Sequence, residues 1–384
     1  MTNDAPFLLD VTRLIWRRWK GRLPTGIDRV CLAYLRHFGS RSQAVVQHDR
    51  FRRILDWEAS QRLFEILASP AHFRLKLPLG VFRHLLGLDC SGGHRLYLNI
   101  GHTGLDAPGF RDWVRTADVR PVYLVHDLIP ITHPEYCRAG EAERHRGRMR
   151  TVLETAAGVI GNSQATLDEL FSFAASEDLA TPPSLAAWLG TDSLPFPRII
   201  RVPERPTFVV IGTIEARKNH MMLLDIWSRL AARLGNQAPR LLIIGQRGWE
   251  ADDVFAVLDG NRQLRSHVVE LSHCSDEELA RNLAEARALL FPSMVEGYGL
   301  PLVEALGMGV PVIASDLPVF REIGSNLPTY LSPTDSAAWE AAILEYARPD
   351  SEARAAQLGR IRDFQAPGWK GHFDAVEAWL PTLG

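Results

Sequence analysis

The chain alternates short apolar runs rich in β-branched residues with longer stretches whose apolar residues recur at helical spacing. This alternation is typical of parallel α/β architecture, because each strand needs a helix to return the chain to the same end of the sheet. The run at 208–211 (Phe-Val-Val-Ile) is apolar on both faces of a strand, which suits a sheet covered by helices on both sides. The pattern therefore predicts doubly wound sheets.

The individual elements follow from the same pattern. In the first half we predict strands at 7–11, 44–48, 95–100, 122–126 and 158–162, with a short strand at 185–189. In the second half we predict strands at 207–213, 240–245, 268–271, 288–291, 310–314 and 329–331, and helices at 221–234 and 276–286 among others. The stretch 368–383 has the spacing of an amphipathic helix.

Length and proline content predict how the chain is divided. A chain of 384 residues exceeds what one hydrophobic core usually serves, so we expect two domains. Six prolines lie between residues 172 and 206, which marks the divide. We predict a first domain at 1–193, a linker at 194–206, a second domain at 207–365, and a terminal helix at 366–384 that packs back on the first domain. Ligands of such folds bind at the carboxyl ends of the strands, here in a cleft between the domains.

Composition excludes several classes of function. A formal net charge of −2 gives no reason to expect nucleic-acid binding, and the apolar runs are too short to span a membrane. The N-terminus lacks a charged leader and an apolar core, so we expect a cytoplasmic protein. The four cysteines (Cys31, Cys90, Cys137 and Cys274) are scattered, which indicates reduced thiols. Since neither metal-type spacing nor an Asp-x-Asp motif is present, we expect no metal and no other cofactor.

The most specific motif lies between residues 292 and 318. Two carboxylates, Glu296 and Glu304, flank a Gly-Tyr-Gly-Leu-Pro turn between a predicted strand and an apolar helix. The turn allows the two side chains to converge, with Glu304 in the first helical turn and the amides of residues 297–300 facing a phosphate group. The alternative is a surface turn with two solvated glutamates.

Two further candidates follow predicted strands. Arg217 and Lys218 come shortly after 207–213, where two cations suit a diphosphate leaving group, although such a pair is often only solvated. His126 and Asp127 end another strand. There His126 would hydrogen-bond a sugar hydroxyl or shuttle a proton, because its ordinary pKa is near neutral. The alternative is a histidine satisfied by backbone groups.

These motifs strongly resemble the retaining GT-B glycosyltransferases of family 4, whose signature is a glutamate, seven residues and a second glutamate around a Gly-aromatic-Gly-Leu-Pro turn. The resemblance implies a GT-B fold, with two Rossmann-like doubly wound α/β domains and an interdomain cleft. It places Glu296 beside the donor sugar, Glu304 on the ribose, and the acceptor against the first domain at His126 and Asp127. It implies catalytic roles for His126, Lys218 and Glu296. The donor-binding residues that it implies are Gly26, Thr213, Arg217, Lys218, Glu296, Gly297, Tyr298, Gly299, Leu300, Pro301 and Glu304.

The chain departs from the family at two places. Many members have Gly-x-Gly where this chain retains only Gly26, and an arginine where this chain has Thr213. The phosphate contacts at the first loop are therefore open, and Arg217 is left to supply the guanidinium.

The function implied is that of a retaining, metal-independent glycosyltransferase in bacterial polysaccharide synthesis. We expect a nucleotide-sugar donor, with GDP-mannose the first choice, and a glycan or lipid-linked glycan acceptor. Alternatives are a UDP-sugar or dTDP-rhamnose transferase, a sugar-nucleotide epimerase, and a non-catalytic glycan-binding protein.

The segment from Arg13 to Arg22 combines basic residues with two tryptophans, and residues 144–150 form a second basic run. Tryptophan with cations suits a membrane surface, so one prediction is docking on the inner face of the cell membrane. The alternatives are a solvated loop with the tryptophans packed inward, and a groove for an anionic acceptor.

Overall fold

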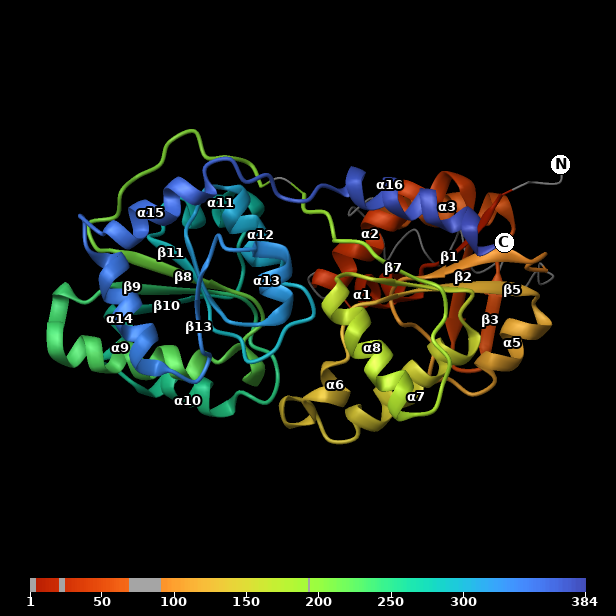
Figure 1. The fold of residues 1–384 in the computed structure, drawn as a ribbon, viewed down its shortest axis with the longest axis horizontal. Helices are drawn as coiled ribbons and strands as arrows, with labels where there is room; N and C mark the ends of the chain where they lie inside the picture. The colour runs from red at the N-terminus through yellow and green to blue at the C-terminus, as the bar shows by residue number, and fades with distance from the viewer. Residues whose placement is uncertain (1–4, 21–24, 69–90, 193) are drawn as a thin grey trace. The chain divides into compact units, whose positions relative to one another are not determined.

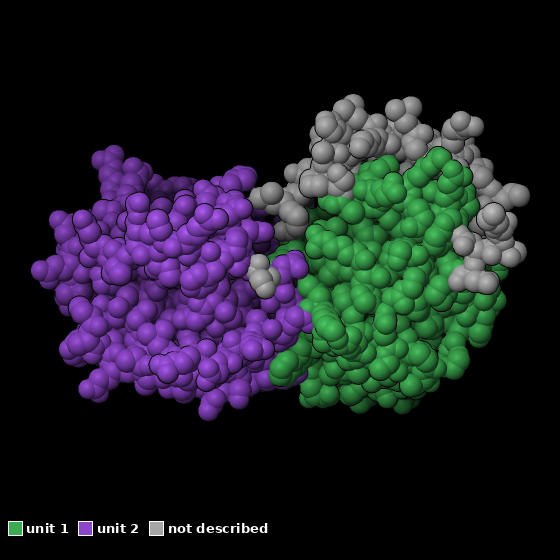
Figure 2. Space-filling model, turned by 90° about the horizontal axis from the view of Figure 1, so that it is seen from above, with its two compact units in different colours: residues 1–131, 142–189, 369–384 green, residues 132–141, 190–368 purple. Residues whose placement is uncertain are grey.

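The computed structural model describes residues 5–20, 25–68, 91–192 and 194–384. Within them the chain forms two units (Figure 2). Unit 1 contains the described residues of 1–131, 142–189 and 369–384, and unit 2 contains those of 132–141 and 190–368. Cys90, residues 21 and 22 of the basic segment, and the predicted boundary residue 193 lie outside the described residues.

Unit 1 is built on a seven-stranded sheet with the order β3-β2-β1-β4-β5-β6-β7 (Figure 1). All neighbouring strands are parallel except β2 and β3. The strands are β1 (Phe7–Asp10), β2 (Ser42–His48), β3 (Phe51–Ile54), β4 (Arg95–Asn99), β5 (Val119–Val125), β6 (Gly158–Gly161) and β7 (Ser184–Ala186). All are predicted by the sequence except β3, a short edge strand that carries two arginines and has no apolar run.

Helices alternate with these strands, as a parallel sheet requires. They are α1 (Thr12–Trp19), α2 (Gly26–Phe38), α3 (Trp57–Ala68), α5 (Phe110–Thr116), α6 (Ile129–Thr132), α7 (Glu141–Thr155) and α8 (Gln164–Ser176). A buried cluster joins Tyr97 and Tyr123 of the sheet to Met149 of α7 and Leu170 of α8. This packing fixes the strand ends on which the loops of unit 1 stand.

The last helix, α16 (Trp369–Trp379), belongs to unit 1. As the amphipathic spacing predicts, its residues Phe373 and Val376 are buried. The ring of Phe373 stacks on His37 of α2 with centroids 3.9 Å apart, and Nε2 of His372 lies 2.8 Å from the hydroxyl of Tyr34.

Unit 2 has a six-stranded, fully parallel sheet with the order β10-β9-β8-β11-β12-β13. Its strands are β8 (Thr207–Ile211), β9 (Arg240–Ile244), β10 (Val268–Leu271), β11 (Ala288–Phe291), β12 (Val312–Ser315) and β13 (Thr329–Leu331), all predicted by the sequence. Its helices are α9 (His220–Leu234), α10 (Asp252–Gly260), α11 (Asp276–Ala284), α12 (Leu300–Gly307), α13 (Pro318–Gly324), α14 (Ser336–Ala347) and α15 (Glu352–Ile361).

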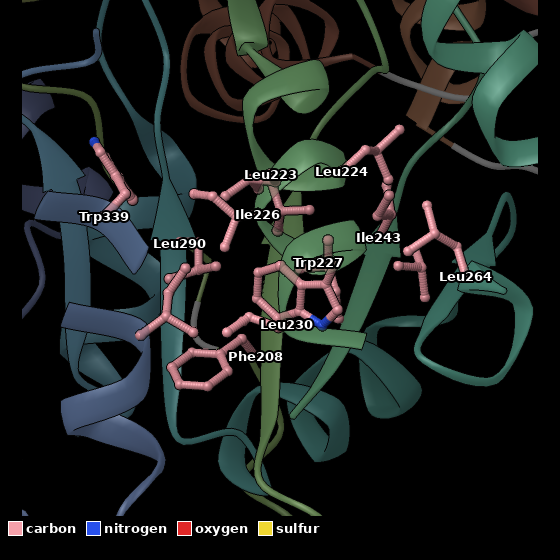
Figure 3. Close-up of a cluster of buried hydrophobic side chains, with 14 of the residues drawn as sticks. Phe208, Leu223, Leu224, Ile226, Trp227, Leu230, Ile243, Leu264, Leu290 and Trp339 are labelled. Atoms are coloured by element: carbon pink, nitrogen blue, oxygen red, sulfur yellow. The ribbon is translucent and has the colours of Figure 1, made fainter. Parts of the chain in front are cut away.

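Strand β8 shows why its run is apolar throughout. Phe208 packs in the cluster around Trp227 of α9, together with Trp339 of α14 (Figure 3). The next residue, Val209, points to the other face and packs with Leu279 of α11. Helices therefore cover both faces, and the prediction of a doubly wound sheet is confirmed.

Each sheet reverses its strand order at one place, between β1 and β4 in unit 1 and between β8 and β11 in unit 2. Loops diverge at such a switch point, and ligands of open α/β sheets bind there, outside the carboxyl ends of the strands. No helix among the described residues is long and apolar enough to cross a membrane.

Candidate functional site

The switch point of unit 2 brings the two predicted motifs together. Strands β8 and β11 pair in parallel, so the loops that follow them leave the same edge of the sheet. A hydrogen bond from the backbone N–H of Met294 to the carbonyl oxygen of Arg217 (2.7 Å) joins the two loops. Asn219 adds a clamp, since its side-chain amide donates to the carbonyl oxygens of Pro292 (3.3 Å) and Pro333 (2.9 Å).

Glu296 lies at the centre of the resulting ion-pair cluster. One carboxylate oxygen, Oε1, accepts from Nζ of Lys218 and from the hydroxyl of Ser293 (2.8 Å). The other, Oε2, accepts from the Arg217 guanidinium at 2.7 Å, which also pairs with Glu215 at 2.6 Å. The side chains of Glu296 and Lys218 are only 7% and 10% exposed. The predicted meeting of Glu296 with the two cations is thus present in the structure.

The electrostatics of this cluster follow from burial opposed by pairing. Burial alone would raise the pKa of Glu296, but the charges of Arg217 and Lys218 outweigh it and lower that pKa to about 2. Burial lowers the pKa of Lys218, and the attraction of Glu296 opposes this change only in part. For Glu215 burial raises the pKa against the attraction of Arg217. Glu296 is consequently a carboxylate whose two oxygens are both engaged.

The glycine turn after Glu296 leads directly into α12. Gly299 has a φ of 113°, and a Cβ there would lie 2.7 Å from the Phe320 ring, so only glycine fits. Helix α12 begins at Leu300 with Pro301 in its first turn, and Tyr298, within the glycine turn, is buried. Leu300 and Pro301 are thus the first two residues of α12, and Gly297 lies in the loop before this helix.

Glu304 lies deeper than the sequence predicted. Because α12 starts at Leu300, Glu304 is its fifth residue and lies beyond the first turn, where it is 5% exposed. The prediction that it belongs to the first turn is therefore wrong.

Gly212, at the end of β8 beside Thr213, has a φ of 139°, and a Cβ there would lie 3.5 Å from Nζ of Lys218. The positive φ of Gly212 favours glycine, which brings bare backbone close to Lys218.

The switch point of unit 1 holds a pocket of about 430 Å³ that is lined by His126 and Asp127. The Nε2–H of His126 donates to the carbonyl oxygen of Ile100 at 2.8 Å, so the neutral ring offers Nδ1 as an acceptor. Burial lowers the pKa of His126 to about 4. The expectation that its pKa stays near neutral is wrong, because desolvation disfavours the charged ring. A hydroxyl-binding role fits this histidine better than proton transfer at neutral pH.

Two histidines that sequence reasoning missed line the same pocket. His102 donates its Nε2–H to the carbonyl oxygen of Leu124 at 2.8 Å, and His145 donates to that of Asp127 at 3.1 Å. The His102 ring centroid lies 5.2 Å from that of His126 and 6.0 Å from that of His145. Burial holds the pKa of His102 well below its ordinary value. The position of His102 in the loop after β4 could have marked it as a site residue, because ligands bind at the carboxyl ends of strands. His145 lies within helix α7, and its position in the sequence gives no such signal.

The turn at Gly26 is the start of α2. Thr25 and Asp28 form a capping box, and Asp28 pairs with Arg13 at 2.7 Å and with Arg17 at 2.8 Å. Gly26 is exposed at the first position of the helix. A carboxylate of the chain itself therefore occupies this helix N-terminus, which lessens its attraction for a phosphate.

The basic and aromatic segment forms helix α1 as far as Trp19, so the alternative of a solvated loop is wrong for these residues. Its tryptophans are not packed inward, since Trp16 is 38% and Trp19 is 47% exposed. The second basic run lies on α7, where Arg144 and Arg148 pair with Asp106. Across the described ranges, no group of three or more His, Cys, Asp or Glu side chains is arranged to hold a metal ion.

Two parallel α/β units with polar clusters at their strand ends define the GT-B class of fold. The chain is similar in fold to the solved structure of Anabaena Alr3699/HepE in complex with UDP-glucose, with a TM-score of 0.68 and 16% identity over 97% of this chain and 98% of that one. This similarity establishes the fold.

Residues 196–357 match the family described as "Glycosyl transferases group 1", so this part of the chain is similar to that group. The chain is 32% identical over 268 residues to the serotype-specific mannosyltransferase WbdA of Escherichia coli, covering 63% of this chain and 32% of WbdA. It is 28% identical to O-antigen chain mannosyltransferase B of the same species over 60% of this chain and 62% of that protein. The chain thus spans about a third of the length of WbdA.

Proposed function

We propose that this protein is a retaining, metal-independent glycosyltransferase that moves mannose from GDP-mannose to a glycan or lipid-linked glycan acceptor in bacterial polysaccharide synthesis. The observation that carries the proposal is the buried cluster of Arg217, Lys218 and Glu296 at the switch point of unit 2. The mannosyltransferase relatives support the choice of sugar.

The cluster suits a nucleoside diphosphate leaving group. Glu296 and Glu215 keep the buried Lys218 and the partly buried Arg217 in place before a donor binds. As the bond to the sugar breaks, negative charge grows on the diphosphate, and fixed cations in a poorly solvated site stabilise that charge strongly. Arg217 supplies a planar fork for phosphate oxygens and Lys218 a compact charge. Glu304, buried on α12 beyond the glycine turn, is proposed to contact the ribose hydroxyls.

The proposed step forms a bond from an acceptor hydroxyl oxygen to the anomeric carbon on the face from which the diphosphate departs. The bond between that carbon and the phosphate oxygen breaks, its electron pair stays on the diphosphate, and the hydroxyl proton passes to the same diphosphate. Glu296 is a poor candidate for a covalent nucleophile, because both of its oxygens are engaged and its pKa is about 2.

Unit 1 is proposed to bind the acceptor in its pocket of about 430 Å³ lined by His102, His126 and His145, which we call the histidine pocket. Neutral His126 and His102 offer ring Nδ1 atoms as acceptors for sugar hydroxyls, and Asp127 adds a carboxylate. Asn162 holds the backbone at His126, since its side-chain amide donates to the His126 carbonyl oxygen at 2.8 Å.

Donor binding gives a direct test. A ligand that binds the native state and is present at a hundred times its Kd adds about 2.7 kcal/mol to stability. Because GDP-mannose is the proposed donor, we expect it to raise the melting temperature more than UDP-glucose or dTDP-rhamnose. With a mannose-terminated acceptor, GDP and an α-linked product should appear together. Three results would contradict the proposal: no shift with any nucleotide-sugar, a β-linked product, or transfer that chelators abolish.

A membrane surface is the partner that helix α1 fits. Trp16 and Trp19 are exposed on α1, and the exposed Lys20 directly follows this helix. We propose that this face contacts anionic lipid headgroups, since tryptophan and cations together favour the interface. Trp19→Ala should reduce co-sedimentation with vesicles of phosphatidylglycerol and phosphatidylcholine, whereas Trp249→Ala, at an equally exposed tryptophan of unit 2, should not. Equal binding by both variants would refute this docking face.

A further inference from the structure

Unit 1 contains a second pocket that none of the roles above uses. It lies between α5 and α7, has a volume of about 1030 Å³, and is lined among others by Arg111, Gly147, Thr151 and Glu154. Pockets for small molecules usually measure roughly 300–1,000 Å³, so this one has room for more than a single sugar. We call it the α5–α7 pocket.

The α5–α7 pocket adjoins the histidine pocket. Asp106 lines both of them. Two arginines of α7 hold this carboxylate, Arg148 from the histidine pocket at 3.3 Å and Arg144 from the α5–α7 pocket at 3.1 Å. Burial would raise the pKa of Asp106, but the charges of these arginines lower it overall, which keeps the shared rim ionised. The two pockets therefore share a rim at Asp106.

The lining of the α5–α7 pocket indicates a neutral, hydroxyl-rich ligand. Four of its charged groups pair with each other, Arg111 with Glu154 at 2.5 Å and Arg115 with Asp112. Because cations and carboxylates offset each other, the pocket does not attract a polyanion as a run of unpaired arginines would. The exposed arginines and carboxylates of these pairs still offer donors and acceptors, which are what sugar hydroxyls need.

Gly147 is a second, independent observation. It lies in the middle of the fifteen-residue helix α7, where glycine is less stable than alanine. A Cβ at this position would meet nothing within 4 Å, so packing does not require glycine there. The residue instead lines the α5–α7 pocket, and a large side chain would project into it. Glycine leaves this part of the pocket wall without a side chain, which is a reason for its presence in the middle of α7.

We propose that the α5–α7 pocket binds the inner residues of a neutral oligosaccharide acceptor whose terminal sugar lies in the histidine pocket. This inference rests on the proposed glycosyltransferase function and makes its acceptor class more specific. The protein then extends an existing glycan chain in preference to adding a first sugar.

The test compares long and short acceptors with Gly147→Trp and Gly147→Ala. With GDP-mannose as donor, we expect the wild type to use α-mannotetraose with at least about tenfold higher kcat/KM than methyl α-mannoside. Gly147→Trp should remove that preference by raising KM for the tetrasaccharide while leaving methyl mannoside within about twofold. Gly147→Ala should behave as the wild type.

Gly359→Trp is the matched control, because Gly359 is also a helical glycine with open space at its Cβ but lies on α15 of unit 2. Calorimetric titration of α-mannotetraose without donor should show binding to wild type and weaker binding to Gly147→Trp. Equal use of both acceptors by the wild type, or tetrasaccharide binding unchanged in Gly147→Trp, overturns the inference. Failure of the proposed function differs from both results, since no acceptor of any length would then receive a sugar.

Discussion

Lys218→Met should lower the rate of sugar transfer by about 10²–10³-fold, the loss typical when one fixed electrostatic group of a catalytic site is removed. The Lys218 ammonium is buried and its Nζ contacts Glu296. Methionine has a similar length but no charge, so the departing diphosphate would retain only the Arg217 guanidinium. Measurements of kcat with saturating donor, and of donor affinity by calorimetric titration, would separate the loss in the transition state from the loss in binding.

Lys370→Met is the matched control for this change. Lys370 is an exposed lysine of α16 that pairs with Asp374 at 2.5 Å, in a surface contact of little energetic worth. It should leave transfer unchanged. If Lys218→Met retained wild-type turnover while its donor affinity also stayed the same, the cation cluster would not be the donor site.

The fold was predictable because its signal is local. Each buried strand shows itself as a short apolar run, and the order of strands and helices follows from the parallel pattern. The convergence of Glu296 with Lys218 was predictable for a related reason. Both residues follow strands in a sheet whose order reverses between them, so the topology brings their loops to one edge.

Burial and pairing could not be predicted in the same way. The lowered pKa of His126 depends on how completely loops from other parts of the chain exclude water. The contribution of His145 depends on the rotation of α7, because its Nε2–H reaches the backbone of Asp127 eighteen positions away. The edge strand β3 pairs through its backbone with β2, and its arginines hide that pairing from an apolar-run criterion. These features belong to tertiary packing.

Glu296→Gln should destabilise the protein by about 3 kcal/mol at neutral pH, since removing one partner of a buried ion pair leaves uncompensated charge. Of the two carboxylates described in this cluster, Glu215 would then be the one left to balance Lys218 and Arg217. The sign of the pH dependence follows from the lowered pKa of Glu296. Its stabilisation is complete above its ordinary pKa of 4.5 and is lost as the pH falls toward about 2.

The measurement is the free energy of unfolding in urea for wild type and Glu296→Gln at about pH 7 and about pH 3. The difference between the two proteins should be large at the higher pH and should shrink at the lower one. Glu340→Gln is the control, because Glu340 also pairs with two arginines, Arg229 at 2.8 Å and Arg233 at 3.0 Å, but these arginines lie at the surface. It should cost less than about 1 kcal/mol. An equal cost for the two substitutions, or a difference between wild type and Glu296→Gln that does not change with pH, would show that burial does not make the Glu296 pairs strong. Glu296 would then not hold Lys218 and Arg217 firmly in place, as the proposed binding of the diphosphate requires.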